Sequence, residues 1–290
     1  MRAWSITEPG SRHSLWRLIS RLGRSHVPAI LAALLVAGCR SGTDDALDAA
    51  WPNEPSGFRV INDYGFDDPI PVGNGVPVGS SGWAVINDSG ATRVTDPSAP
   101  RSPPDVLHIT FPTGFTGGVA PVTMWYDFPA TRPRELYVGF WLKVSNPWQG
   151  HSSGVNKIAY ITTGGTQDAL IPELFGQAAP YRLRMAVFEL GASQNPVYGG
   201  WLDPNVEDVT PTLGAWHRIE IYAKYGTSST SNDGIVRVWM DRTLMMSYSD
   251  INFAHDGFDG WKLSPTWGGI GDTKREDDSF WFDHVHASGR

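Results

Sequence analysis

The feature that most constrains the fold is a two-residue alternation of side-chain character that returns in several segments of the chain. In residues 135–144, ELYVGFWLKV, every second residue from the leucine onward is aliphatic or aromatic, and the residues between them are aromatic, small or polar. The same alternation recurs in residues 181–190, 216–224 and 233–241. Successive side chains of a β-strand point to opposite faces of a sheet. Each segment therefore predicts a strand with one face in a hydrophobic core and the other face outside it.

Clusters of Gly, Pro, Asn and Asp separate these segments, and no segment carries a helical stripe of useful length. Strands that are buried on one face only are typical of two antiparallel sheets packed face to face. The sequence therefore predicts an all-β fold, a two-sheet antiparallel jelly-roll sandwich. Residues 58–290 suffice for one such domain, since all-β sandwiches often form single units of about 200–250 residues.

The N-terminal residues 1–38 have the pattern of an export signal. Several arginines precede an apolar run at residues 27–37, which is shorter than the roughly 20 residues that a transmembrane helix needs. The run leads into LVAGC, residues 35–39, which resembles the lipobox of bacterial lipoproteins. The resemblance implies cleavage before Cys39, lipidation of Cys39 and a place in the bacterial cell envelope. A plain secretory signal with an incidental cysteine is the alternative interpretation.

Residues 39–57 are polar and acidic and contain Pro and Gly, so we expect a flexible tether between the lipid anchor and the domain. Cys39 is the only cysteine of the chain, so no disulfide is expected. The formal net charge is −7, and no block rich in Lys and Arg follows the export signal. We therefore expect no nucleic-acid partner, because such proteins need cations that neutralise phosphates. Membrane contact is expected only through the lipid anchor.

The order of several segments resembles the concanavalin A-like lectin/glucanase superfamily. These segments are LYVGFWLKV, WQGHSSGVNKI, WHRIEIYAKY, DGIVRVWMD, SPTWGG and FWFDHVHASG. Within that superfamily, the likeness is greatest to jelly rolls related to polysaccharide lyases and to uncharacterised bacterial relatives. The resemblance implies the fold but not one activity, because the superfamily includes lectins, hydrolases, lyases and adhesion modules. Its hydrolases carry their catalytic carboxylates on a Glu-x-Asp-x-x-Glu strand, which this sequence lacks, so a hydrolase of that type is not expected.

The first functional hypothesis is that the domain binds a polysaccharide. The chain has 13 tryptophans, and flat rings with polar edges suit the apolar faces of sugars. Alternation places aromatic and cationic side chains together on faces that point away from the core. The ligand-binding set predicted from this pattern is Tyr137, Trp141, Lys143, Gln149, Lys157, Arg182, Arg184 and Trp239. Burial of individual rings under a loop or under the N-terminal part of the chain is the alternative.

The second hypothesis is a polysaccharide lyase that cleaves a uronate-containing glycan by β-elimination. Such lyases need cations or amides for the substrate carboxylate, a base for the adjacent proton and an acid for the leaving oxygen. The resemblance implies Arg, Gln or Asn, His and Tyr for these roles. The predicted catalytic set is His151 or Tyr222 as base, with Arg184, assisted by Arg182 and Lys157, on the carboxylate. A non-catalytic structural or adhesion module of the envelope is the third hypothesis.

The C-terminal segment raises the question of a metal. Asp272, Asp278 and Asp283 are close in sequence and are candidates for a structural calcium ion, which relatives in the superfamily often carry. His284 and His286 share a strand face, but zinc would need further ligands that the sequence does not identify. Hydrogen bonds of Asp283 and His284 to neighbouring loop backbone are the simpler interpretation. No cofactor is expected, apart from this calcium candidate.

Overall fold

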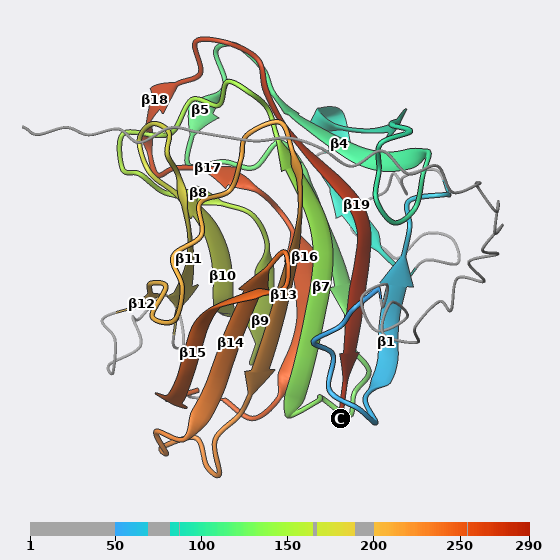
Figure 1. Cartoon of the computed structure of the whole chain (residues 1–290), viewed down its shortest axis with the longest axis vertical. Coiled ribbons are helices and arrows are strands. Elements are labelled where there is room, and N and C mark those ends of the chain that lie inside the picture. Colours follow the sequence, from blue (N-terminus) through green and yellow to red (C-terminus); the bar gives the residue numbers. More distant parts are fainter. Residues whose placement is uncertain (1–49, 69–81, 87, 165–166, 189–199, 254) are drawn as a thin grey trace, which may run out of the picture. The chain divides into compact units, whose positions relative to one another are not determined.

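The computed structural model describes residues 50–68, 82–86, 88–164, 167–188, 200–253 and 255–290. Within these residues the chain forms β-strands and one short 3-10 helix, η1 (Asp88–Gly90). The strands make two large antiparallel sheets that lie in two layers (Figure 1). The predicted all-β jelly-roll sandwich is therefore confirmed. No helix in the described part of the chain is long and apolar enough to cross a membrane.

Each sheet combines strands that are far apart in the sequence. Sheet A contains, from edge to edge, β15 (Thr243–Ile251), β14 (Gly234–Met240), β13 (Trp216–Lys224), β7 (Glu135–Val144), β19 (Asp278–Gly289), β4 (Asp105–Phe111) and β3 (Ala91–Thr95), with β1 (Arg59–Tyr64) beside β19. Sheet B contains β12 (Trp201–Leu202), β11 (Arg182–Val187), β10 (Gln167–Phe175), β9 (Tyr160–Thr163), β16 (Phe258–Leu263), β6 (Thr123–Asp127) and β2 (Ala84–Ile86). In sheet B, β8 (Asn156–Lys157) pairs with both β10 and β17 (Thr266–Trp267), and β5 (Thr116–Gly117) pairs with β18 (Gly271–Thr273) in a small third sheet.

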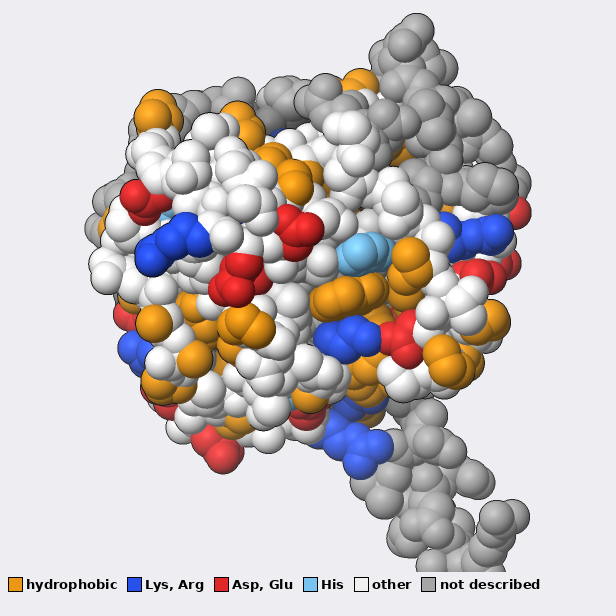
Figure 2. All heavy atoms as spheres, turned by 90° about the horizontal axis from the view of Figure 1, so that it is seen from above, with side chains coloured by type: hydrophobic (Ala, Val, Ile, Leu, Met, Phe, Trp, Pro, Cys, Tyr) orange, Lys and Arg blue, Asp and Glu red, His pale blue; other side chains and the backbone are white. Residues whose placement is uncertain are grey.

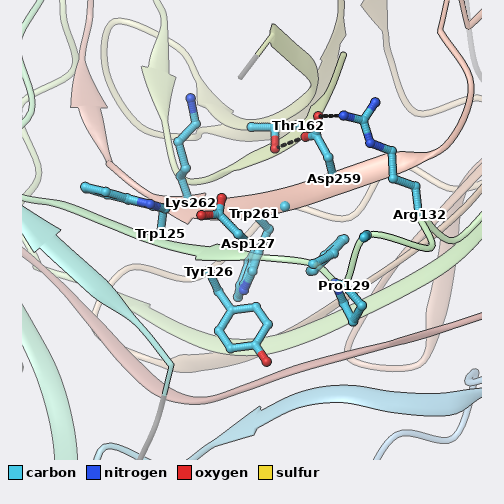
Figure 3. A pocket seen from close by; sticks show the side chains of 12 residues that line it. Trp125, Tyr126, Asp127, Pro129, Arg132, Thr162, Asp259, Trp261 and Lys262 are labelled. Atoms are coloured by element: carbon cyan, nitrogen blue, oxygen red, sulfur yellow. Dashed lines mark hydrogen bonds and ion pairs between the residues drawn. The ribbon is translucent and has the colours of Figure 1, made fainter. Parts of the chain in front are cut away.

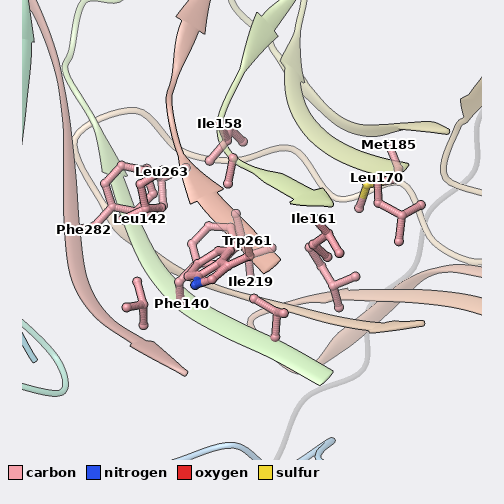
Figure 4. Packing of buried hydrophobic residues seen from close by; sticks show 14 of the residues in the cluster. Phe140, Leu142, Ile158, Ile161, Leu170, Met185, Ile219, Trp261, Leu263 and Phe282 are labelled. Carbon is pink, nitrogen blue, oxygen red and sulfur yellow. The ribbon is translucent and has the colours of Figure 1, made fainter. Parts of the chain in front are cut away.

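The hydrophobic core lies between the facing sides of sheets A and B (Figure 4). Phe140 of β7 faces Trp261 of β16, with their ring centroids 5.9 Å apart. Every residue that the alternation assigns to the core of β7, β11, β13 and β14 is buried. Each fully buried large apolar side chain contributes about 1.5–3 kcal/mol to stability. The alternation in the sequence thus identifies the inner faces of the sandwich correctly.

The segment that precedes β1 packs against the outer face of sheet A, the face away from the core. The indole of Trp51 stacks on His286, with ring centroids 5.3 Å apart. It fits there because Gly139 has no side chain: a Cβ at Gly139 would lie 2.4 Å from the indole. Asn53 donates hydrogen bonds from its backbone N and from Nδ2 to Glu220, at 3.1 and 3.2 Å. From residue 50 onward the predicted tether therefore contacts the domain, whereas residues 39–49, Cys39 included, and the export signal lie outside the described residues.

Candidate functional site

The two sheets divide the residues that the sequence assigns to one ligand-binding face. The outer face of sheet A carries Tyr137, Trp141, Lys143, Tyr222 and Trp239. The outer face of sheet B carries Lys157, Arg182 and Arg184. Because the core lies between these two faces, Tyr222 and Arg184 cannot contact the same sugar residue. The structure therefore does not bring together the predicted ligand-binding set, nor a catalytic set that combines these two residues.

Contacts within the protein cover the aromatic residues predicted on sheet A. Tyr137 is fully buried, and its hydroxyl donates a hydrogen bond to Glu220 at 2.5 Å. Trp239 is partly buried and packs against a cluster formed by Trp51, Tyr137 and Tyr222. The N-terminal segment therefore covers part of this face, as the alternative interpretation of the sequence proposed.

Lys143 and Trp141 are also engaged by neighbouring side chains. The Lys143 ammonium lies 4.8 and 4.9 Å from the centroids of two tryptophan rings and forms an ion pair with Asp96. Trp141 is partly buried, and the Cζ atom of Arg218 lies 5.6 Å from its ring centroid. A sugar would have to displace these contacts in order to bind here. The outer face of sheet A is the weaker candidate for a binding site, because sheet B carries Lys157, which forms no hydrogen bond or ion pair with any described residue.

Tyr222 is poorly suited to the predicted role of catalytic base. Its side chain is almost fully buried, and its hydroxyl donates a hydrogen bond to Glu135 at 3.0 Å. Burial, together with this hydrogen bond, raises the pKa of Tyr222 to about 12. A hydroxyl with this pKa keeps its proton at neutral pH, so it cannot readily remove a proton from a substrate.

His151 and Gln149 hold loops together, and only Gln149 also lines a cavity, one of about 460 Å³ between these loops. His151 is buried, and its Nδ1 and Nε2 atoms lie 2.8 Å from Ser153 Oγ and 3.3 Å from the Gly271 carbonyl oxygen. Gly268 lies against the His151 ring, where a Cβ would be 1.9 Å from its Cγ. Gln149 accepts a hydrogen bond from the Arg275 backbone N at 2.8 Å. Both residues thus connect the turn before β8 to the β17–β18 region.

On the outer face of sheet B, a row across four strands contains two cationic side chains, one carboxylate and one threonine. Thr266, Lys157, Glu173 and Arg184 are paired in register on β17, β8, β10 and β11. Arg184 Nη2 forms an ion pair with Glu173 Oε2 at 3.2 Å. Its guanidinium Cζ lies 3.7 Å from the ring centroid of Phe175 and 5.0 Å from that of Trp201, which is 37% exposed. We call Thr266, Lys157, Glu173 and Arg184 together the cationic row.

A second row lies beside the cationic row on the same face. Trp125, Lys262 and Tyr160 are paired in register on β6, β16 and β9. The ammonium groups of Lys262 and Lys157 lie 5.1 and 6.0 Å from the Tyr160 ring centroid. The Tyr160 hydroxyl forms a hydrogen bond with Thr266 Oγ1 at 2.9 Å, which links the two rows.

The charges of the two rows favour an anionic ligand. Three cations, Lys157, Arg184 and Lys262, accompany one carboxylate, Glu173. Within the described residues, the Lys157 ammonium forms no hydrogen bond or ion pair, so its charge is available to a ligand. Burial raises the pKa of Glu173, although Arg184 and Lys157 act to lower it. At the edge of the sheet, the predicted residue Arg182 pairs with Asp208 at 3.0 Å and is partly exposed.

A cavity of about 510 Å³ adjoins the second row (Figure 3). It is lined mainly by Trp125, Tyr126, Asp127, Phe128, Pro129, Arg132, Thr162, Asp259 and Lys262. Thr162 donates a hydrogen bond to Asp259 at 2.7 Å, and Arg132 forms an ion pair with Asp259 at 3.7 Å. Trp125 and Lys262 belong to both the second row and the cavity, so the two features are continuous.

The end of the domain near β18 and β5 differs from the outer face of sheet B. Seen from above, the described part of this end carries acidic and basic side chains, some of them adjacent to each other, among hydrophobic and uncharged ones (Figure 2). No continuous patch of one sign covers the described residues in this view. The excess of positive charge on the two rows is therefore a local feature of sheet B rather than a property of that end.

The sequence reasoning missed Tyr160, Glu173 and Lys262. Uninterrupted alternation along residues 155–161 predicts that Tyr160 points into the core together with Ile158, but only Ile158 does so. The strand is interrupted after Lys157 and resumes at Tyr160, which shifts the alternation and places Tyr160 on the outer face. Glu173 lies in a strand that contains a proline and no clear alternation, so the sequence carries no signal for its position.

The acidic residues proposed for calcium serve separate contacts. Asp278 forms an ion pair with Lys274 at 2.5 Å, and Asp272 accepts a hydrogen bond from the Ser152 backbone N at 3.0 Å. Asp283 accepts hydrogen bonds from two backbone N–H groups of the 101–102 loop, as the simpler interpretation predicted. His284 bonds side chains instead, Ser102 and Asp63. Among the described residues no group of three or more potential ligands converges on a metal position.

The fold is similar to that of several solved polysaccharide lyases. An alginate lyase from Aplysia kurodai superposes with a TM-score of 0.55 and 12% identity, covering 80% of this chain and 100% of that chain. An alginate lyase in complex with an alginate tetrasaccharide superposes with a TM-score of 0.53 and 12% identity, covering 79% of this chain and 96% of that chain. Alginate lyase vAL-1 from Chlorella virus superposes with a TM-score of 0.52 and 13% identity, covering 72% of this chain and 93% of that chain. No protein-family model and no curated relative matches the sequence. Identities this low establish a shared jelly-roll fold and leave the activity to be argued from the site.

Proposed function

We propose that the outer face of sheet B binds a polysaccharide that contains uronate residues. The observation that carries this proposal is the cationic row, in which Lys157 and Arg184 lie on one face beside a partly exposed tryptophan. Carboxylates pair well with a guanidinium, which can donate two parallel hydrogen bonds. The face of a sugar ring can stack on the Trp201 indole. This combination suits an acidic sugar better than a neutral one.

Binding can be tested by titrating the full-length protein with glucuronan, alginate, pectate and heparin in a calorimeter. Lys157→Met and Arg184→Met should each weaken binding of the preferred acidic polymer at least about tenfold, because a charged hydrogen-bonding partner is worth roughly 1.5–3 kcal/mol. Arg59→Met is the matched control, since Arg59 is an exposed cation on β1 of sheet A. Equal affinities for the wild type and both sheet B variants would refute the proposal.

Cleavage by β-elimination is the second candidate function, and one observation favours it. Lys157 and the Tyr160 ring are neighbours, and Arg184 lies two strands away in the same pairing network. In this scheme Arg184 pairs with the substrate carboxylate, and the Lys157 amine takes the proton from the adjacent carbon. The electron pair forms a carbon–carbon double bond as the bond to the glycosidic oxygen breaks. That oxygen takes a proton from the Tyr160 hydroxyl.

The elimination product contains an unsaturated uronate that absorbs ultraviolet light, so cleavage can be followed by absorbance. If the protein is a lyase, absorbance rises with the acidic polymer that binds best, and Tyr160→Phe abolishes the rise while it leaves binding within about threefold of the wild type. Binding without any rise in absorbance would instead identify a non-catalytic carbohydrate-binding module. A structural or adhesion role is favoured if no polymer binds at all.

We also propose that Cys39 anchors the protein to the bacterial cell envelope. The support is the lipobox-like LVAGC segment at the end of the export signal. Cells that express the protein and receive labelled fatty acid should incorporate the label into the wild-type chain and not into Cys39→Ser. Equal labelling of both chains would contradict the anchor.

A further inference from the structure

The cavity beside the second row has a different charge character from the cationic row. Asp127 lines the cavity from β6 and is exposed, and it forms no hydrogen bond or ion pair with any residue that the structure describes. The other carboxylate, Asp259, is held by Thr162 and Arg132. The positive charge of Arg132 is thus paired with Asp259 and does not offset the charge of Asp127. Lys262 also lines the cavity, but its ammonium lies 5.1 Å from the ring centroid of Tyr160 in the second row. A ligand in the cavity therefore meets, at Asp127, a carboxylate that no described side chain holds.

The floor and walls of the cavity are suited to a sugar ring. Thr162, Gly260 and Asp127 are paired in register on β9, β16 and β6, so Gly260 lies between the two polar side chains. A Cβ at Gly260 would lie 2.8 Å from the Tyr126 carbonyl oxygen and 3.1 Å from Thr162 Oγ1, so the close approach of the strands here requires glycine. Trp125 and Pro129 form apolar walls on opposite sides of the cavity (Figure 3). Apolar walls with a few polar groups are typical of carbohydrate subsites.

The position of the cavity makes it a neighbouring subsite of the cationic row. Lys157, Tyr160 and Thr162 follow one another along β8 and β9, and Thr162 is two residues beyond Tyr160. Two residues of a strand span about 6.5 Å. A polymer that lies along these strands, with a uronate at the cationic row, therefore reaches the cavity with another of its sugar residues.

We infer that this cavity accepts a sugar residue without a carboxylate, so that the substrate is a heteropolysaccharide in which uronate is combined with neutral or amino sugars. The inference rests on the proposed function of sheet B. A second uronate in the cavity would be repelled by Asp127, which at a separation of about 6 Å lowers affinity about threefold in water and further where water is excluded. A hydroxyl or an amide can instead donate a hydrogen bond to the Asp127 carboxylate.

The experiment compares two polymers with the full-length protein by calorimetry. In glucuronan every residue is a uronate, whereas in hyaluronan glucuronate alternates with N-acetylglucosamine. The wild type should bind hyaluronan more tightly than glucuronan. Asp127→Asn should raise the affinity for glucuronan at least threefold. It should change the affinity for hyaluronan less, so that the preference for hyaluronan over glucuronan becomes smaller. Glu276→Gln is the control, because it removes an exposed carboxylate that does not line the cavity. It should leave the ratio of the affinities for hyaluronan and glucuronan unchanged.

The possible results separate this inference from the proposed function. If Lys157→Met weakens both polymers but Asp127→Asn leaves their affinity ratio unchanged, the inference is overturned and the acidic-polysaccharide site stands. If wild-type protein prefers glucuronan, the inference is likewise overturned. If neither polymer binds, or if Lys157→Met has no effect on either, the proposed function fails and the inference fails with it.

Discussion

Glu173 is the carboxylate that lies between Lys157 and Arg184 in the cationic row, and it tests whether the charge of that row controls binding. Burial raises its pKa, so it takes up a proton at a higher pH than an ordinary glutamate. Protonation removes the negative charge beside Arg184 and should strengthen binding of an acidic polymer as the pH falls. Glu173→Gln mimics the protonated state, so it should bind the polymer more tightly at neutral pH and lose this pH dependence. Titrations across the acidic range would decide, and an unchanged pH profile in the variant would assign the effect to another group.

Asp96 offers a pH prediction for stability rather than for binding. Burial acts to raise its pKa, but hydrogen bonds from Lys143 and Ser98 outweigh burial and lower the pKa to about 2. Because the carboxyl has a pKa of 3.8 without these contacts, its ionised form stabilises the fold above that pH. The contribution is lost as the pH falls through about 2. Asp96→Asn should therefore lower the Tm near neutral pH by a few degrees. This difference in Tm should shrink in acid, and a constant difference would show that the ion pair is not its cause.

At the scale of elements, the contact between the N-terminal segment and β7 depends on one missing side chain. Trp51→Ala should cost about 3 kcal/mol of stability, because it removes a large buried ring. Gly139→Ala should have a similar cost, because its Cβ would occupy the position of the indole. The two changes affect the same contact, so the double variant should lose much less than the sum of the two. Gly269→Ala, where a Cβ meets nothing within 4 Å, is the control. Additive losses in denaturant titrations would mean that Trp51 does not pack at Gly139.

The strands of this protein could be predicted from the sequence, and the composition of the site could not. The bounds of β7 and β13 agree with the predicted segments, because alternation is a direct consequence of burial on one face. Alternation does not specify which strands pair. Tyr222 pairs with β7 in sheet A, which joins distant parts of the chain, whereas Arg184 pairs with the preceding strand β10 in sheet B. Lys157 and Arg184 were predicted from residue type and face, whereas Tyr160 depends on an interruption between β8 and β9 that the sequence does not signal.

At the scale of the whole molecule, the two outer faces of the sandwich differ in how far they are covered and in their charged groups. The outer face of sheet A is partly covered by the N-terminal segment, and its charged groups are engaged by neighbours such as Asn53 and Asp96. The outer face of sheet B concentrates cations on a chain whose formal net charge is −7. An acidic polymer is thus attracted by one small region and repelled by the molecule as a whole. The balance between these forces depends on how far each extends through the solvent.

This balance predicts an affinity for acidic polymers that passes through a maximum as salt is added. At about 0.01 M salt, charges act over about 30 Å, so the net negative charge of the whole molecule opposes binding. At about 0.1 M they act over about 10 Å, so the repulsion fades while the contacts of Lys157 and Arg184 persist. At higher salt those contacts are screened as well, and affinity falls. Calorimetric titrations over this range would check the prediction, with Lys157→Met showing a smaller fall at high salt. An affinity that falls steadily from the lowest salt would mean that the charges near the site alone determine binding.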